Sequence, residues 1–126
     1  MAGRGGPRRT WLRTPIAAVT TLSTHVLDVE RGVPAVGVPV ALFAGDLLLT
    51  QRETDPGGRI ADLAGGSLEP GTYRLVFDVA AYLATQGRPA PFLQRVTIEF
   101  QTDRSMPHHH VPLLMSAYAC TSYRGS

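Results

Sequence analysis

Four histidines, an arginine after a tight turn and a serine at the last position are the residues of this 126-residue sequence best suited to chemistry. Three of the histidines are consecutive, His108-His109-His110, and the fourth is His25. A neutral imidazole, with an ordinary pKa of about 6.5, is a natural general base for activating water. Arg59 follows Asp55-Pro56-Gly57-Gly58 and could present a fixed guanidinium to a developing oxyanion. Ser126 offers a hydroxyl and an α-carboxylate together.

Each of these residues also has an ordinary structural interpretation. A single histidine in a strand, such as His25, is more often hydrogen-bonded structure than catalyst, and an arginine after a turn is usually solvated. Histidines at i and i+2 can bind zinc, but a zinc site needs further ligands that the spacing does not supply. We expect Cys120 to be a small packed residue and not a nucleophile, because nothing in the sequence identifies a base to pair with it. No glycine-rich phosphate loop, HExxH motif or nucleophile elbow is present. The residues alone therefore predict a possible His/Arg site and leave a metal site open.

The elements that would position these residues are short strands. Alternating apolar residues predict extended segments bounded by glycine and proline turns. A strand would put His108 and His110 on one face and His109 on the other. One helix is expected, capped by Asp78, with Val79, Tyr82 and Leu83 on its apolar face and Gly87 at its end. Seven or eight strands and one helix predict an all-β protein, a β-sandwich. The expected strands cover 22–28, 36–42, 47–53, 59–63, 72–77, 96–100 and 108–115.

Composition and charge argue against a membrane-spanning helix, a nucleic-acid-binding surface and a disulfide framework. The chain is 44% hydrophobic and 17% charged, and no apolar run approaches the about 20 residues that a membrane helix needs. All twelve cations are arginines, and the first twenty residues hold four of them and no acid. The rest holds 8 arginines against 10 acids (12 − 4 against 10), so we expect neither nucleic acid nor membrane as a partner. The single cysteine excludes an intrachain disulfide and favours a reducing, cytoplasmic location.

Residues 1–20 show neither helical nor strand periodicity, and we expect a disordered extension before a single domain over 21–126. Arg8-Arg9 followed by Ile16 to Val19 weakly resembles an export signal. Pro15 interrupts that apolar stretch, which is shorter than the about 7–15 residues that such signals use. An exported protein and an over-long start remain the alternatives.

Taken together, the motifs resemble the 5-hydroxyisourate hydrolases, the transthyretin-related enzymes of urate breakdown. The resemblance runs from about residue 22 to 126. Leu22 to Asp28 (LSTHVLD), with Gly32-Val33-Pro34-Ala35 after it, is similar to the first motif of the family. Gly58-Arg59 is similar to the end of its central Asp-Gly-Arg motif. His108 to Leu114 (HHHVPLL) resembles its His-Tyr-His-Val-Pro-Leu-Leu, and Tyr123-Arg124-Gly125-Ser126 resembles its terminal tetrapeptide.

The resemblance implies a transthyretin-like sandwich of two four-stranded sheets with one short helix. It also implies a homotetramer, a dimer of dimers, with active sites in a channel between dimers and no cofactor or metal. The implied reaction opens the six-membered ring of 5-hydroxyisourate to form 2-oxo-4-hydroxy-4-carboxy-5-ureidoimidazoline.

The implied catalytic residues are His25, Arg59, His110 and Ser126. His108 and Tyr123 line the site, and His25, Arg59 and Ser126 also bind substrate. A water attacks the lactam carbonyl, Arg59 stabilises the oxyanion, and either His25 or His110 is the base, because the order of their pKa values depends on burial and neighbours.

Two departures from the family pattern stand out. His109 replaces the usual tyrosine and is expected on the face opposite His110, where the change is tolerated. Gly57 stands where aspartate is common, which could loosen the turn that aims Arg59. The rival interpretation is a non-enzymatic transthyretin-like binding module in which His108 and His110 hold a metal adventitiously.

Overall fold

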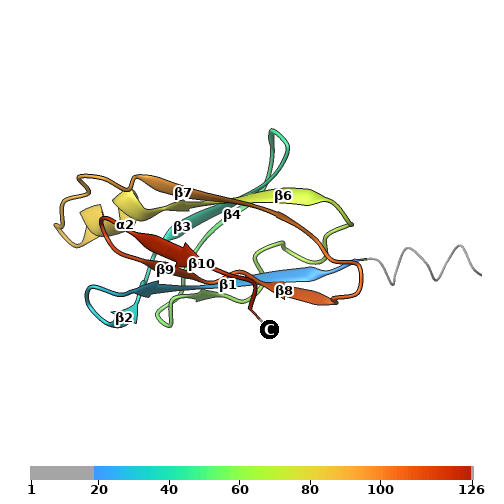
Figure 1. Ribbon diagram of the computed structural model, residues 1–126, viewed down its shortest axis with the longest axis horizontal. Helices are drawn as coiled ribbons and strands as arrows, with labels where there is room; N and C mark the ends of the chain where they lie inside the picture. The colour runs from blue at the N-terminus through green and yellow to red at the C-terminus, as the bar shows by residue number, and fades with distance from the viewer. Residues whose placement is uncertain (1–18, 126) are drawn as a thin grey trace, which may run out of the picture.

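Two β-sheets packed face to face form the molecule, with the single described helix at one end (Figure 1). The computed structural model describes residues 19–125. The expected extension over 1–20 and the candidate Ser126 therefore lie outside the described residues, apart from Val19 and Thr20. One sheet is antiparallel, in the order β4-β3-β6-β7. Its strands are β3 (Pro39–Ala44), β4 (Leu47–Glu53), β6 (Thr72–Asp78) and β7 (Arg95–Gln101).

The second sheet is built around β1 (Thr21–Asp28) and has six strand segments where four strands were expected. On one edge of β1, β8 (His108–His110) and β9 (Leu113–Met115) pair in parallel with its first and last three residues. On the other edge, β5 (Arg59–Ile60) and β2 (Val33–Pro34) pair antiparallel with it, one after the other. The six segments thus occupy four strand positions, because Val111-Pro112 divides one long strand and a loop separates β2 from β5. The sixth segment is β10 (Cys120–Ser122), which pairs with β9.

The core between the sheets follows the period-two pattern of the sequence. Along β1 the alternate residues Leu22, Thr24, Val26 and Asp28 are buried. The strand expected over 36–42 begins later, at Pro39, so Val36, which the same alternation would place inward, is 48% exposed. Proline at the first position of a strand costs no ladder hydrogen bond there. The extended segment expected over 59–63 is likewise shorter, ending at Ile60.

The expected helix is confirmed as α2 (Val79–Thr85). The Asp78 carboxylate accepts a hydrogen bond from the N–H of Ala81, which satisfies one donor at the helix start. Val79, Tyr82 and Leu83 are buried. Gly87, directly after the helix end, has a φ of 67°, the left-handed conformation that glycine adopts most readily.

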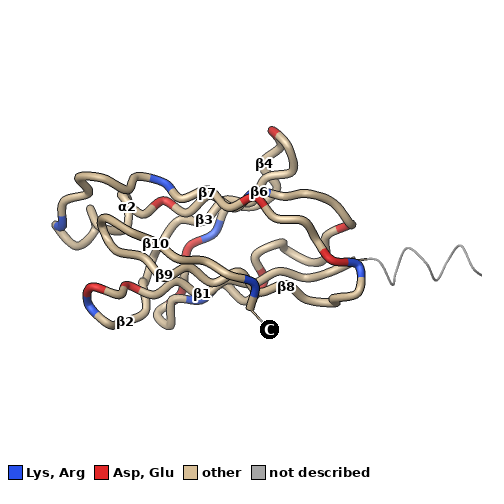
Figure 2. Tube along the Cα trace, in the orientation of Figure 1, with Lys and Arg blue, Asp and Glu red and all other residues tan. Residues whose placement is uncertain are grey.

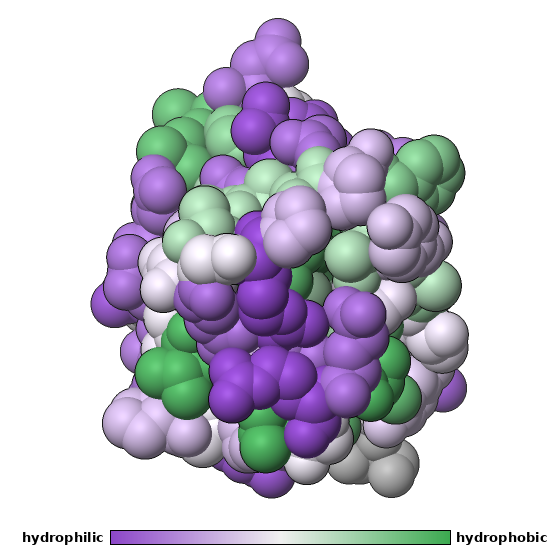
Figure 3. Space-filling model, turned by 90° about the vertical axis from the view of Figure 1, so that its left-hand side faces the viewer, coloured by the Kyte–Doolittle hydropathy of each residue, from purple (hydrophilic) through white to green (hydrophobic). Residues whose placement is uncertain are grey.

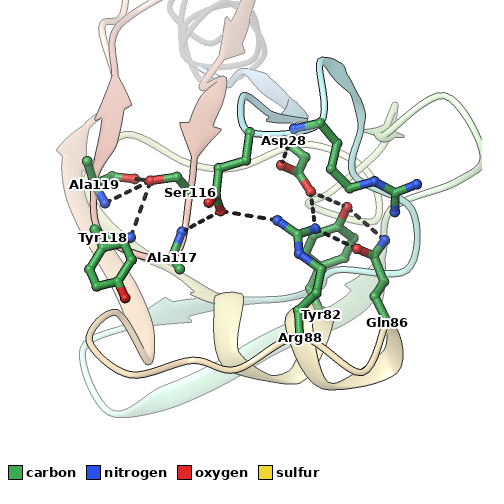
Figure 4. A network of polar contacts seen from close by, with 10 residues as sticks. Asp28, Tyr82, Gln86, Arg88, Ser116, Ala117, Tyr118 and Ala119 are labelled. Atoms are coloured by element: carbon green, nitrogen blue, oxygen red, sulfur yellow. Dashed lines mark hydrogen bonds and ion pairs between the residues drawn. The ribbon is translucent and has the colours of Figure 1, made fainter.

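A polar network ties α2 to the end of β1 (Figure 4). Asp28 is fully buried, and its Oδ2 accepts hydrogen bonds from the Tyr82 hydroxyl at 2.8 Å and the Arg88 guanidinium at 2.6 Å. Arg88 also pairs with Glu30, whose carboxylate accepts the N–H of Ala117. Burial would raise the pKa of the Asp28 carboxyl, but the hydrogen bonds from Arg88, Tyr82 and the backbone outweigh it and lower that pKa. The same end of the molecule shows hydrophilic side chains at its centre (Figure 3).

Basic and acidic residues are scattered along the described chain in short stretches, separated by long uncharged segments (Figure 2). This distribution agrees with the near balance of 8 arginines and 10 acids after the first twenty residues. Within residues 19–125 there is no helix that is both long and apolar enough to span a membrane.

Candidate active site

The outer face of the β1 sheet brings together four of the residues that the sequence singled out. Because alternate β1 residues point inward, His25 stands on the outward face. Its partner in the antiparallel β5 ladder is Arg59, so the two residues lie directly opposite each other and their side chains are on the same face of the sheet. On the other edge, the parallel register places Ser23 level with His110. The face thus carries the imidazoles of His25 and His110 and the guanidinium of Arg59. His108 lies on the same face, two residues before His110 in β8.

The His25 ring is oriented by a backbone carbonyl. Its Nε2 lies 3.0 Å from the carbonyl oxygen of Gly57. A carbonyl oxygen can only accept a hydrogen bond, so Nε2 carries the hydrogen. In the neutral ring the lone pair is therefore on Nδ1, and this nitrogen is available to take a proton.

The turn that presents Arg59 is held by Asp55 and not by the residue at position 57. One carboxylate oxygen of Asp55 accepts the N–H groups of Gly57 and Arg59, both at 2.9 Å. Gly58 has a φ of +75°, and a Cβ added to it would lie 2.5 Å from the carbonyl oxygen of Val26. Glycine is thus required at 58, and the turn remains closed although aspartate is absent at 57.

His110 is held from both sides. Its Nδ1 lies 2.8 Å from the Ser23 hydroxyl, and its carbonyl accepts the N–H of Gly125 at 2.8 Å. Burial lowers the pKa of the His110 imidazole, and the positive charges of Arg59, His108 and His25 lower it further. The ring is therefore kept neutral to a lower pH than an ordinary histidine, as a general base near neutral pH requires.

The pairing of Gly125 with His110 returns the end of the chain to this face. Ser126 follows Gly125 in the sequence but lies outside the described residues, so its role stays a prediction. Tyr123, the other expected residue of this segment, lines a cleft of about 200 Å³ that His109, Phe100 and Val111 also line. Tyr123 thus lies beside His109 in this cleft, and its place in the substrate site stays a prediction.

His109 points inward, as the alternation predicted, and is 3% exposed. Its Nε2 accepts the N–H of Asp103 at 3.0 Å, so the neutral ring carries its hydrogen on Nδ1, which lies 3.0 Å from the Thr20 hydroxyl. Burial lowers the pKa of His109, and nearby Asp103 opposes that effect. Both ring nitrogens are satisfied, which makes His109 a structural residue.

The interpretation of the sequence missed the hydroxyl residues of β1. The Ser23 hydroxyl lies 2.7 Å from Nε2 of His108 as well as 2.8 Å from Nδ1 of His110. Thr21 bonds to the other nitrogen of His108. The signal was partly available, since Ser23 and His25 alternate on one face of the strand predicted over 22–28, and Thr21 directly precedes it. The pairing of β1 with β8 could not be read from the strand pattern.

The arrangement of possible metal ligands can be stated for the described part of the chain. Nowhere within it do three or more His, Cys, Asp or Glu side chains converge as metal ligands. His108 and His110 share a face, but Nε2 of His108 and Nδ1 of His110 each form a hydrogen bond with the Ser23 hydroxyl.

Comparison with known proteins identifies the family to which this chain belongs. The family model described as "Transthyretin: HIUase/Transthyretin family" matches residues 22–125. The chain belongs to this family. A 5-hydroxyisourate hydrolase of Caulobacter vibrioides is 40% identical over 112 residues, which cover 83% of this chain and 97% of that protein.

Solved structures extend the comparison within the HIUase/transthyretin family. The Klebsiella pneumoniae 5-hydroxyisourate hydrolase has a TM-score of 0.79 and 37% identity, covering 85% of this chain and 99% of that one. Sea bream transthyretin, solved in complex with thyroxine, has a TM-score of 0.73 and 26% identity, covering 83% and 94%. These neighbours confirm the transthyretin-like sandwich.

Proposed function

We propose that this protein hydrolyses 5-hydroxyisourate to 2-oxo-4-hydroxy-4-carboxy-5-ureidoimidazoline. The observation that carries the proposal is the cross-strand pair of His25 and Arg59, with His110 on the same face of the sheet. A base beside a fixed cation suits the attack of water on a carbonyl, which creates negative charge on oxygen. The identity of 40% to a 5-hydroxyisourate hydrolase supports the choice of substrate.

The proposed reaction begins with water held between the histidines. His25 or His110 takes a proton from the water as its oxygen forms a bond to the lactam carbonyl carbon. Arg59 stabilises the resulting oxyanion by charge-assisted hydrogen bonds. The carbonyl then re-forms, the C6–N1 bond breaks, and N1 takes the proton back from the imidazole. No cofactor is needed, because the proton that is removed is the proton that is returned.

Substrate binding involves the rest of the predicted set. We assign His108, Tyr123 and the terminal Ser126 to binding, together with His25 and Arg59. A homotetramer, with sites in a channel between dimers, would bring side chains of neighbouring copies to this outer face. A cytoplasmic location completes the proposal and is consistent with Cys120, which is an exposed free thiol and not the packed residue that the sequence predicted.

The test generates 5-hydroxyisourate from urate with urate oxidase and follows its ultraviolet decay with and without the protein. We expect acceleration by the wild type, a fall in kcat of about 10²–10³-fold in Arg59→Ala and of about 10²–10⁴-fold in His110→Ala. Arg95→Ala, on β7 of the other sheet, is the matched control and should leave kcat unchanged. Decay at the spontaneous rate with folded wild type would overturn the proposal in favour of a binding module.

Two further measurements separate parts of the proposal. Residues added after Ser126 should weaken activity or substrate affinity, and unchanged kinetics would remove the terminal group from the site. A chelator should leave the rate unchanged. A rate that falls with chelator and returns with added zinc would instead assign His108 and His110 to a metal.

A further inference from the structure

A chain of hydrogen bonds runs along the outer face from His110 to the backbone of Pro107. Nδ1 of His110 lies 2.8 Å from the Ser23 hydroxyl, and that hydroxyl lies 2.7 Å from Nε2 of His108. Nδ1 of His108 is bonded to the Thr21 hydroxyl. The Thr21 hydroxyl also contacts the carbonyl oxygen of Pro107, at 3.4 Å. Four side chains from two strands thus form one continuous chain of donors and acceptors.

The Pro107 carbonyl at the end of the chain favours one direction, through a long contact of 3.4 Å with the Thr21 hydroxyl beside the 3.0 Å hydrogen bond that its oxygen accepts from the Thr21 N–H. Because the Pro107 oxygen can only accept, the Thr21 hydroxyl donates to it and accepts a hydrogen bond from Nδ1 of His108. The neutral His108 ring then has its lone pair on Nε2 and accepts the Ser23 hydrogen. Ser23 has one hydrogen only, so it accepts from Nδ1–H of His110. The lone pair of His110 is left on Nε2.

The reverse direction satisfies fewer groups. If the Thr21 hydroxyl donated to Nδ1 of His108, no hydrogen would lie between that hydroxyl and the Pro107 oxygen. Each later bond would reverse as well, and the lone pair on Nδ1 of His110 would face Ser23. His110 would then present an N–H to the outer face and could not act as a base. Among residues 19–125, no other group forms a hydrogen bond with either ring nitrogen of His110, so Ser23 is the contact that selects the tautomer.

We propose that Ser23 is a positioning residue: through it, His108 and Thr21 hold His110 with its hydrogen on Nδ1 and its lone pair on Nε2, and share the proton that Nε2 takes up. This inference rests on the proposed hydrolysis. When Nε2 takes a proton from water, the Nδ1 hydrogen moves to the Ser23 oxygen and the Ser23 hydrogen moves to Nε2 of His108. The positive charge then lies on His108, which is exposed to solvent. Transfer of the Nε2 proton to the leaving nitrogen reverses each step.

The charges around His110 favour such sharing. His25 on β1, Arg59 on β5 and His108 on β8 all face it, and with burial they disfavour a cation on this ring. A relay that moves the charge to the more exposed His108 relieves that cost. The hydrogen bonds of Ser23 are also short enough, at 2.7 and 2.8 Å, for both rings to share one hydroxyl.

The test uses the full chain labelled with ¹⁵N-histidine and reads the tautomer of each ring by NMR without substrate, with His110→Gln to assign its signals. We expect wild-type His110 in the Nδ1–H form and a mixture of forms in Ser23→Ala. Activity of Ser23→Ala should fall about 10–100-fold in kcat with little change in KM, the size typical of lost orienting contacts. Ser23→Thr keeps the hydroxyl and should restore both the tautomer and kcat.

Thr97→Ala, which removes an exposed hydroxyl from β7 of the other sheet, is the matched control and should change neither readout. A thermal melt of each variant identifies loss of folding. An Nε2–H tautomer in the wild type, or a His110 spectrum and kcat unchanged in Ser23→Ala, would overturn the relay. The NMR result needs no substrate, so a wild type without hydrolase activity overturns the proposed function alone.

Discussion

Gly125 lies so close to the ring of His110 that no side chain fits between them. A Cβ added to Gly125 would stand 2.6 Å from Cδ2 of His110, and the N–H of Gly125 donates to the His110 carbonyl at 2.8 Å. The contact joins the end of the chain to a proposed catalytic base. The glycine of the terminal tetrapeptide is therefore explained by close approach of backbone to ring.

Gly125→Ala should consequently displace either the His110 ring or the terminal segment. We expect a loss of at least about 10²-fold in kcat/KM, since small displacements of catalytic groups cost that much. The ultraviolet assay measures the loss, and a thermal melt tests whether the fold persists. Gly71→Ala, where φ is not positive and an added Cβ meets only the Tyr73 ring at 3.7 Å or more, is the control for glycine replacement. Full activity in Gly125→Ala would contradict the contact.

The turn before Arg59 predicts opposite results at two neighbouring glycines. Gly58→Ala places a Cβ 2.5 Å from the Val26 carbonyl in a left-handed conformation, and should lower the free energy of unfolding by at least about 1–3 kcal/mol. Gly57→Ala meets only Asp55 Oδ1, at 3.4 Å, and should change stability by less than about 0.5 kcal/mol. Urea denaturation of the pair measures both. Equal loss in the two variants would show that the backbone conformation at 58 is not the cause.

The pKa of His110 should respond to the charge of Arg59. Burial and then the Arg59 guanidinium lower the His110 pKa, so Arg59→Gln should raise it towards the ordinary value of about 6.5. NMR titration of the His110 ring measures this directly. In the wild type, activity should stay on its plateau below that ordinary value and fall only at more acidic pH. Arg95→Gln should leave the titration unchanged, and no shift in Arg59→Gln would contradict the electrostatic account.

His109 should make the fold sensitive to mild acid. Its pKa is lowered in the folded protein by burial, so the unfolded chain binds more protons in the range between the two pKa values. The stabilisation from the neutral ring is complete above the unfolded pKa of about 6.5 and is lost as pH falls towards the folded pKa. Urea midpoints measured at several pH values should show a smaller acid loss in His109→Tyr than in the wild type. An identical pH dependence in the two proteins would assign the acid sensitivity elsewhere.

The buried Asp28 network should stabilise the end of the sandwich that α2 covers. Arg88→Ala leaves a buried carboxylate without its cation and should cost about 3–5 kcal/mol of unfolding free energy. Tyr82→Phe removes one hydrogen bond and should cost about 1–3 kcal/mol. The control is Arg124→Ala, since the Arg124–Asp103 pair is exposed and its atoms are 3.6 Å apart. We expect no measurable change there, and a loss equal to that of Arg88→Ala would show that burial is not what matters.

The strand pattern was readable because burial of one face imposes a period of two. Along β1, the alternation of Leu22, Thr24 and Val26 with polar residues predicted both the strand and the outward direction of His25. The same rule separated His109 from its two neighbours. The helix was predicted for a related reason, since Asp78 and Gly87 are local signals that need no distant partner. The start of the strand expected over 36–42 was wrong by three residues, because alternation does not mark where a strand begins.

Sequence by itself therefore determined the class of fold, the face of each strand residue and the residue types available for catalysis. All of these depend on near neighbours along the chain. Only the tertiary structure decided that Ser23 lies between His108 and His110, and that Gly125 packs on His110. Ser23 is more than 80 positions from both histidines, and Gly125 reaches His110 only after the chain has turned back. Both contacts are created by the pairing of strands. Register between strands is a property of the assembled sheet, so no local pattern could reveal which hydroxyl holds the catalytic ring.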